Sequence, residues 1–373
     1  MQTNRTVTVS LLLVLAVGWL ILVLDTRTAR AVLCDQLFKL LADDGEPNET
    51  FGFSVAINNN VALVGAVCDD VAGSCSGSAY LFNAAGGEQL FKLVPDDGAA
   101  GDWFGNSVGI SGNTAIVGSY QDDDRGDFSG AAYLFDVATG AQRMKLFPAD
   151  GASNDQFGQS VAIGENVAIV GAPFDDDRGN SAGSAYLYDV STGSQLAKLF
   201  ASDAQADDRF GISVAISGNT AIVGAYEDTD LGSDAGSAYL FDVKTGAQIA
   251  KLLPEDGDEY DHFGFSVAIS GNIALVGAYK GQLGPLDEPG AAYVFDVATG
   301  TQIAQFLPFS DSNLDLTGWS VGVSGSVAVI GAPRDDDRGN NAGAAYLISV
   351  VPEPASIILA TALLAAAAVP RRS

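Results

Sequence analysis

A unit of about 53 residues, present six times, constrains the fold of this chain more than any other feature. A Ser-Val pair recurs at intervals of 53 or 54 residues, and its serines are Ser54, Ser107, Ser160, Ser213, Ser266 and Ser320. A second series keeps the same register, with glutamines at Gln36, Gln89, Gln142, Gln195, Gln248 and Gln302. Two independent landmarks in one register exclude coincidence. A period of this length is typical of repeat architectures such as solenoids and propellers.

Each copy predicts four short strands separated by turn residues. In the third copy the predicted strands are residues 159–163, 167–171, 184–189 and 195–200. The first two are joined by Gly164-Glu165-Asn166, and glycine and asparagine tolerate the positive φ of a tight hairpin. Four antiparallel strands in a unit of this length are typical of a propeller blade.

The order of the predicted strands favours a closed ring. A Gln-headed fourth strand occurs once before the first Ser-Val strand, at residues 36–41, and none follows the last third strand at residues 345–349. The N-terminal strand can therefore complete the last blade and leave no open sheet edge. We expect an all-β fold, a closed β-propeller of six four-stranded blades. An open solenoid, the alternative, would expose hydrophobic strand edges.

Phe-Gly dipeptides precede the Ser-Val pair in five copies, at Phe51-Gly52, Phe104-Gly105, Phe157-Gly158, Phe210-Gly211 and Phe263-Gly264. Gly-Ala-Pro or a variant follows some 13 residues later, as in Gly171-Ala172-Pro173, and the sixth copy has Thr317-Gly318-Trp319 instead of Phe-Gly. Over residues 36–349 this pattern resembles FG-GAP repeats, the blades of the integrin α-subunit propeller and of many bacterial surface proteins. The family's calcium loop, an Asp-x-Asp-x-Asp-Gly type segment between strands one and two, is absent from the short turns of this chain, so that calcium site does not carry over.

The N-terminus predicts a secretory signal. Arg5 precedes an unbroken apolar run at residues 11–24, and Ala29-Arg30-Ala31 fits the cleavage site, so we expect residues 1–31 to be removed. The run is shorter than the roughly 20 residues of a spanning helix, although a retained signal anchor stays an alternative. A lipoprotein site at Cys34 is disfavoured by the bulky Leu33 before it.

The C-terminus has three parts: Pro352-Glu353-Pro354, an apolar segment at residues 355–369, and Arg371-Arg372. This tail resembles the PEP-CTERM sorting signal of Gram-negative bacteria. The resemblance implies export across the inner membrane, transient anchoring there by residues 351–373, and processing by an exosortase-type enzyme, usually in cells that make exopolysaccharide. The Arg pair would hold the C-terminus on the cytoplasmic side. A plain tail anchor is the alternative.

Charge and composition argue against several classes of protein. The 373 residues include 46 Asp plus Glu against 18 Lys plus Arg, and the formal charge of −28 with no basic cluster repels phosphate backbones, so a nucleic-acid partner is not expected. One His and three Cys cannot build a zinc framework or a disulfide-rich scaffold. For the predicted propeller, residues 32–350, the count is 13 basic and 44 acidic residues, or about −31.

The acidic residues are predicted to gather on one face of the ring. Strand direction alternates within a blade, so the loop from strand two to three and the loop to the next blade emerge on the same side, opposite short Gly, Asn and Thr turns. Clustered Asp plus loop carbonyls could bind Ca²⁺, and the candidate ligands are Asp122, Asp124, Asp175, Asp177, Asp228, Asp230, Asp335 and Asp337. The alternative is that these loops only keep the protein soluble, with each following Arg paired to a neighbouring loop.

Catalytic residues are not evident. No copy shows a nucleophile with a base partner, and we expect His262 to be a solvated loop residue. Cys68 and Cys75 flank the first acidic loop and could form a disulfide, which would leave Cys34 unpaired. The tyrosines of the repeated Tyr-Leu-Phe triplets are expected in the core between blades; they are Tyr80, Tyr133, Tyr186, Tyr239 and Tyr293.

The sequence therefore favours an exported, non-enzymatic module of the cell surface or extracellular matrix that binds or adheres, with Ca²⁺ dependence through the acidic face left open. Its expected partners are an exosortase-type enzyme and either an extracellular polysaccharide or a surface protein, and it would contact the membrane only through its terminal segments. A hydrolase or lyase acting on polysaccharide stays an alternative, although the near-identity of the copies speaks against it. A passive structural surface protein is the third class.

Overall fold

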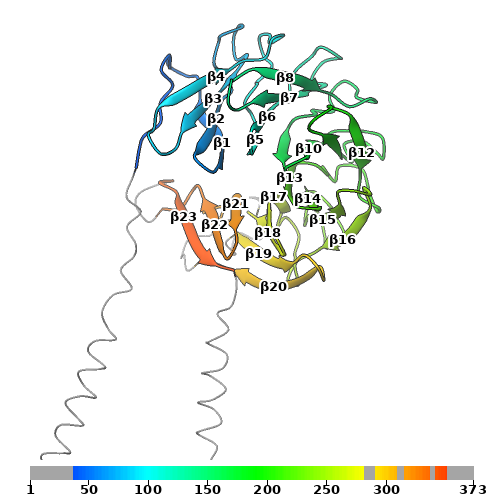
Figure 1. Cartoon of the computed structure of the whole chain (residues 1–373). Helices are drawn as coiled ribbons and strands as arrows, with labels where there is room; N and C mark the ends of the chain where they lie inside the picture. The colour runs from blue at the N-terminus through cyan, green and yellow to red at the C-terminus, as the bar shows by residue number, and fades with distance from the viewer. Residues whose placement is uncertain (1–36, 281–289, 309–314, 337–340, 351–373) are drawn as a thin grey trace, which may run out of the picture. The chain divides into compact units, whose positions relative to one another are not determined.

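The computed structural model describes residues 37–280, 290–308, 315–336 and 341–350. Their regular structure consists of strands, in six antiparallel sheets that follow one another around a ring, with the first strand of a sheet toward the middle and the fourth at the outside (Figure 1). All the strands belong to one compact unit that begins at Leu40. In the described ranges no helix is long and apolar enough to cross a membrane.

The strands follow the repeat. The first sheet contains β1 (Phe51–Asn58), β2 (Val61–Ala66), β3 (Ser78–Asn83) and β4 (Gln89–Leu93), and the second contains β5 (Val108–Ser111), β6 (Thr114–Ser119), β7 (Ala131–Asp136) and β8 (Gln142–Leu146). The third contains β9 (Ser160–Ile163), β10 (Val167–Ala172), β11 (Ser184–Asp189) and β12 (Gln195–Leu199). The fourth contains β13 (Ser213–Ser217), β14 (Thr220–Ala225), β15 (Ser237–Asp242) and β16 (Gln248–Leu252). The fifth contains β17 (Phe263–Ser270), β18 (Ile273–Ala278), β19 (Ala291–Asp296) and β20 (Thr301–Phe306), and the sixth contains β21 (Ser320–Ser324), β22 (Val327–Ala332) and β23 (Ala344–Ser349).

The predicted architecture, an all-β propeller of six blades, is confirmed. The four strands predicted in the third copy agree with β9 to β12 to within one residue at each end. Sheet order is sequential in every blade, so consecutive strands of a blade pair with each other, the second and third across the long acidic loop.

Neighbouring sheets meet where a glycine of one touches a glycine of the next. Gly211 opens the fourth blade with φ +96°, and a Cβ built on Gly171 of the third blade would lie 2.0 Å from the Gly211 carbonyl oxygen. Ser160 Oγ donates to that same oxygen at 2.8 Å. Four more pairs repeat this contact: Gly65 with Gly105, Gly118 with Gly158, Gly224 with Gly264, and Gly277 with Gly318. The two glycines of the sequence motif are thus the two sides of the joint between blades.

The core lies between the blades. Phe210, the residue before Gly211, is fully buried and packs edge-on against Tyr239 and Phe241, with ring centroids 5.5 and 5.7 Å apart. Side chains of the preceding blade, including Ile169 and Leu187, complete the same cluster. The tyrosines of the Tyr-Leu-Phe triplets are buried at this position in every copy that carries the triplet, as predicted.

The joint between the sixth and first blades differs from the other five. The sixth sheet has three strands in the described residues, Leu37–Leu41 form no strand, and Gln36 lies outside the described residues. The side chains of Val55 and Ile57 are 70% and 66% exposed, whereas their equivalents in the second blade, Val108 and Ile110, are 9% and 8% exposed. The predicted closing strand is therefore not formed here, and without it the apolar faces on both sides of this joint stay uncovered.

Both predicted address labels fall outside the described residues: the signal at 1–31 and the sorting segment at 351–373, with Pro352, Glu353, Pro354, Arg371 and Arg372. The predicted disulfide is present, since the sulfur atoms of Cys68 and Cys75 are bonded across the first acidic loop. Cys34 lies outside the described residues.

The glycine contact predicts the cost of a single methyl group. Gly171→Ala should lower the free energy of unfolding by about 3 kcal/mol or more, because the new Cβ meets backbone that cannot move without separating two blades. Gly218→Ala is the control: its Cβ meets nothing within 4 Å and φ is +58°, so it should cost only about 1–2 kcal/mol of left-handed strain. Chemical denaturation measures both, and equal losses would contradict the joint described.

Candidate functional site

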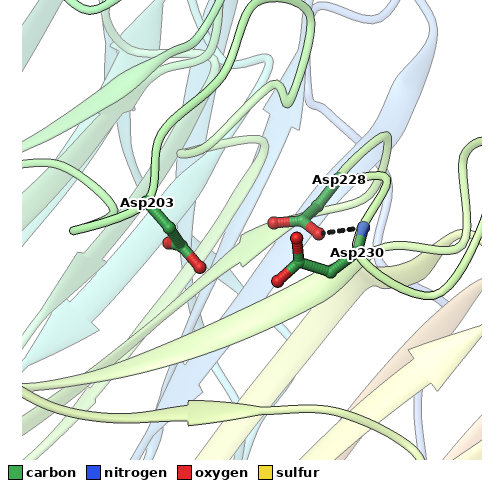
Figure 2. Close-up of side chains that lie close together, drawn as sticks. All are labelled: Asp203, Asp228 and Asp230. Atoms are coloured by element: carbon green, nitrogen blue, oxygen red, sulfur yellow. Dashed lines mark hydrogen bonds between the residues drawn. The ribbon is translucent and has the colours of Figure 1, made fainter.

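In the first four blades the acidic loops converge on a lysine from the fourth strand of the blade. In the fourth blade, Lys251 Nζ lies 2.8 Å from Asp203 Oδ2, 2.9 Å from Asp228 Oδ2 and 2.6 Å from Asp230 Oδ2. Asp203 comes from the loop that enters the blade, whereas Asp228 and Asp230 come from the loop between β14 and β15. Figure 2 shows the three carboxylates turned toward one another. We call such a group of a lysine and its aspartates a lysine–aspartate cluster.

The innermost aspartate of the cluster is fixed from several directions. Asp228 is 2% exposed, and its Oδ2 accepts the Tyr239 hydroxyl at 2.7 Å. Its Oδ1 accepts the backbone N–H of Asp230 at 3.0 Å, the dashed line of Figure 2. The buried tyrosine of the triplet therefore links the core between blades to the acidic loop, since one side chain packs in the core and hydrogen-bonds the loop.

The cluster recurs in three other blades. Lys145 contacts Asp97, Asp122 and Asp124 at 2.9, 2.8 and 2.6 Å, and Lys198 contacts Asp150, Asp175 and Asp177 at 2.9, 2.8 and 2.5 Å. Lys92 contacts Asp44 and Asp69 at 2.6 and 2.8 Å, and in this first copy Val71 stands where the others have their third aspartate. The tyrosine hydroxyl donates to the buried aspartate in each of these blades as well.

The electrostatics of the clusters favour the charged forms. Burial opposes a charged ammonium, but hydrogen bonds to three aspartates outweigh it and raise the pKa of Lys251. Burial likewise opposes a charged Asp203, and its hydrogen bond to Lys251 outweighs that effect, so the pKa of this carboxyl is lowered. The same directions hold in the other clusters, so each lysine and the aspartate of its entering loop stabilise each other as ions.

Most of the predicted metal ligands lie in these clusters. Asp122, Asp124, Asp175, Asp177, Asp228 and Asp230 all contact a lysine ammonium. Asp335 is 3% exposed and accepts the Tyr346 hydroxyl at 3.1 Å, and Asp337 lies outside the described residues. Among the described residues, Asp203, Asp228 and Asp230 are the group whose oxygens come close enough to hold one metal ion, within 4.8 Å of one another.

These residues do not fit Ca²⁺ while the lysine is in place. Calcium takes about six to eight oxygen ligands at roughly 2.3–2.6 Å, and the ammonium of Lys251 already occupies the space between the three carboxylates. Sequence reasoning missed this lysine and the aspartate of the entering loop, Asp203. A sequence pattern could have revealed the lysine. It holds the fourth position of every Gln-headed segment except the last of them, which belongs to the fifth blade and has Gln305.

The sequence suggested that the arginines following the acidic triplets pair with a neighbouring loop. Two of them, Arg125 and Arg178, instead contact aromatic rings. The guanidinium carbon of Arg125 lies 3.4 Å from the ring centroid of Phe147, and that of Arg178 lies 3.7 Å from the centroid of Phe200. Both are cation–π contacts, which leave the outer carboxylates of these loops facing solvent.

A second feature breaks the repeat. Tyr226, His262, Phe265, Tyr279 and Trp319 form one contiguous set of rings, which we call the aromatic group. His262 stacks on Tyr279 with centroids 4.8 Å apart and on Tyr226 at 5.6 Å, and Phe265 lies 4.6 Å from Tyr279 and 4.7 Å from Trp319. Trp319 is 42% exposed. The group lies where β14 and β18 end and β17 and β21 begin, beside the acidic loops.

The expectation that His262 is a solvated loop residue was wrong. Its side chain lies between two tyrosines, the residue is 9% exposed, and burial lowers the pKa of the imidazole, so the ring is neutral at neutral pH. Its backbone has φ +55°, as the residue before the Phe-Gly position has in every copy, and this conformation places the side chain among the rings. No sequence pattern revealed this, because the neighbours of His262 are acidic loop residues.

A further set of aspartates is buried without a cation. Asp155 is 4% exposed, its Oδ2 accepts the N–H of Ala152 at 2.7 Å, and burial raises the pKa of this carboxyl to about 6. Asp102 and Asp208 hold the same position in their copies, with pKa values also raised to about 6 by burial. These carboxylates cap the entering loop and are costly to ionise.

Asp155 predicts a pH dependence with a defined sign. The folded state keeps this proton to about pH 6 while the unfolded chain releases it near pH 4, so the stability it contributes is present at low pH and is lost as pH rises through 6. The stability advantage of the wild type over Asp155→Asn should therefore be about 2 kcal/mol larger at pH 4.5 than at pH 7.5. Urea titrations at both pH values measure it, with Asp208→Asn expected to behave alike. A difference independent of pH would contradict the assignment.

The repeat pattern and its joints agree with a known family. The family model described as FG-GAP repeat matches residues 35–82, 88–135, 141–188, 194–241, 247–295 and 301–348. No curated protein matches the chain. Each match begins just before a Gln-headed segment and runs through the first three strands of the blade that follows it. Together the six matches cover more than half of the chain, so it belongs to the FG-GAP repeat family.

Proposed function

We propose that this protein is an exported, non-enzymatic binding module that recognises a neutral extracellular polysaccharide with its aromatic group. The FG-GAP propeller is typically a binding scaffold without catalytic residues, and proteins of this family are typically extracellular or at the cell surface. The predicted signal at residues 1–31 and the tail at residues 351–373 support export, with transient inner-membrane anchoring in a Gram-negative-type cell and processing by an exosortase-type enzyme.

The aromatic group carries the proposal because it is where the copies differ. The glycines, serines and buried tyrosines keep one register through the blades, since they form the joints. One position of the aromatic group varies in every copy: where the fifth copy has His262, other copies have Thr50, Trp103, Gln156, Arg209 and Leu316. Packing of the joints does not fix the residue at this position, yet here it contributes to a set of adjacent rings from the fourth, fifth and sixth blades. We take this as the mark of a recognition surface.

The charge of the molecule selects among polymers. Acidic loops flank the aromatic group, and the net charge of −28 repels polymers that carry uronate, sulfate or phosphate. A neutral polysaccharide has no such penalty, and its sugar rings can stack on a partly exposed Trp while loop carboxylates accept hydrogen bonds from hydroxyls. Because the lysine–aspartate clusters already contain a cation, we expect this binding to need no Ca²⁺.

Two other functions have less support. A hydrolase or lyase acting on polysaccharide needs a general acid and base within reach of the substrate. The buried His262 is held between two tyrosines, and its Nδ1 lies 2.8 Å from the Tyr260 carbonyl oxygen, which gives it a packing role. A passive surface protein would explain the regular blades but not the aromatic group. A surface protein as the partner, which the sequence also allowed, is one outcome of the test below.

The proposal predicts that removal of one aromatic ring weakens binding. In affinity electrophoresis through gels containing a neutral polysaccharide extracted from the producing cells, the wild type should be retarded, and Trp319→Ala should weaken retardation at least about tenfold, the cost of one stacked ring. An acidic polysaccharide in the gel should not retard either protein.

The control is Trp103→Ala, which removes a tryptophan that packs on Tyr120 in the second blade, outside the aromatic group. It should leave retardation unchanged. Retardation lost equally in both variants, or absent in every neutral extract while a surface protein binds, would overturn the polysaccharide as the ligand.

A further inference from the structure

We infer that Lys92, Lys145, Lys198 and Lys251 are the resident cations of the acidic face, and that their ammonium groups exclude divalent metal ions from the carboxylate clusters. This inference is independent of the proposed ligand, because it concerns the loops themselves. It argues against the Ca²⁺ binding that the sequence left open for these carboxylates.

The geometry of the cluster is that of an occupied cation site. An ammonium has three N–H donors, and Lys251 Nζ meets three carboxylate oxygens from two different loops at 2.6–2.9 Å. The same arrangement recurs around Lys145 and Lys198, with distances of 2.5–2.9 Å. The lysine side chains in these three clusters are only 15–17% exposed, so each ammonium is largely buried beneath the loops.

The fifth copy provides an independent observation. It has Gln305 in place of the lysine, and at the positions of Asp228 and Asp230 it has Gly281 and Leu283. The lysine and two of its three aspartates are therefore absent together. The remaining one, Asp256, accepts Gln305 Nε2 at 2.8 Å, so a neutral amide takes over the contact that the ammonium makes elsewhere. If the aspartates served a metal, loss of the lysine would favour keeping them, whereas aspartates that serve the lysine are expected to be lost with it, as in this copy.

The charge balance explains why a lysine can replace a metal here. Three carboxylates within 4.8 Å of one another repel strongly when they are partly buried, and a cation must accompany them. A lysine supplies that cation from the same chain, without dependence on the metal content of the medium. It also ties the fourth strand to two loops, which a free ion would do only when bound.

The test replaces the ammonium with an uncharged side chain of similar length. In the full-length protein, thermal unfolding of the wild type should give the same midpoint in a calcium chelator and in excess CaCl₂. Lys251→Met in chelator should unfold about 5–10 °C lower, because it leaves buried carboxylates without a partner, and CaCl₂ should restore part of this loss. Adding Asp230→Asn to Lys251→Met should abolish the restoration, which locates the ion.

Gln305→Met is the matched control, since it makes a similar substitution at the same position of a copy whose fourth strand has no lysine, and CaCl₂ should not change its midpoint. Calorimetric titration of the wild type with CaCl₂ does not depend on whether any variant folds. Calcium binding to the wild type that Asp230→Asn weakens would overturn the inference. A Lys251→Met protein that folds but shows no calcium response would overturn it as well.

Discussion

The contact between two glycines at five of the six joints is the constraint on which the rest of this propeller depends. At Gly171 and Gly211 the backbones of neighbouring blades approach so closely that no Cβ fits between them, and a serine hydroxyl seals the contact. That approach sets the spacing at which Phe210 can enter the core of the adjoining blade pair. Because every blade must offer one glycine forward and one backward, the sequence has to repeat with a fixed period. The repeat unit is thus defined by its joints, and the strands between them can vary more freely.

The second constraint is charge, and each of the first four blades meets it with its own lysine. Aspartate favours tight turns and is therefore common in loops, but several such loops on one face of a ring bring like charges together. The fourth strand supplies a lysine under the loops, and the buried tyrosine holds the innermost carboxylate in place. The outermost carboxylates, such as Asp124 at 57% and Asp177 at 61% side-chain exposure, keep the surface negative. The face is therefore neutralised at its base and acidic where it meets solvent.

The sequence predicted the features that repeat in every copy, and it failed for contacts that depend on the three-dimensional arrangement of distant residues. The spacing of Ser160 and its equivalents was enough to place the strands to within a residue, because each blade solves the same packing problem. The role of Lys251 could not be deduced, because its partners lie 21, 23 and 48 residues away and meet it only once strand register is known. His262 was misjudged for a related reason: its acidic neighbours are typical of a solvated loop, while its left-handed backbone places the ring among aromatic side chains of two blades. The closing strand was predicted from the order of the strands alone, and the sixth sheet, with three strands in the described residues, does not include it.

Repetition and divergence carry different information in such a molecule. A residue that recurs in every copy serves a contact that every copy makes, so the glycines and the tyrosines report on stability, and the lysines do so in the four blades that carry them. A residue type confined to some copies cannot serve that purpose, and when several such residues touch one another across blades their common role must be something the ring does once. The aromatic group meets this criterion, since its five rings come from three blades and lie beside the acidic loops. The six-fold scaffold is in this sense the frame for a single asymmetric surface, and the proposed binding role rests on the chemistry of that surface.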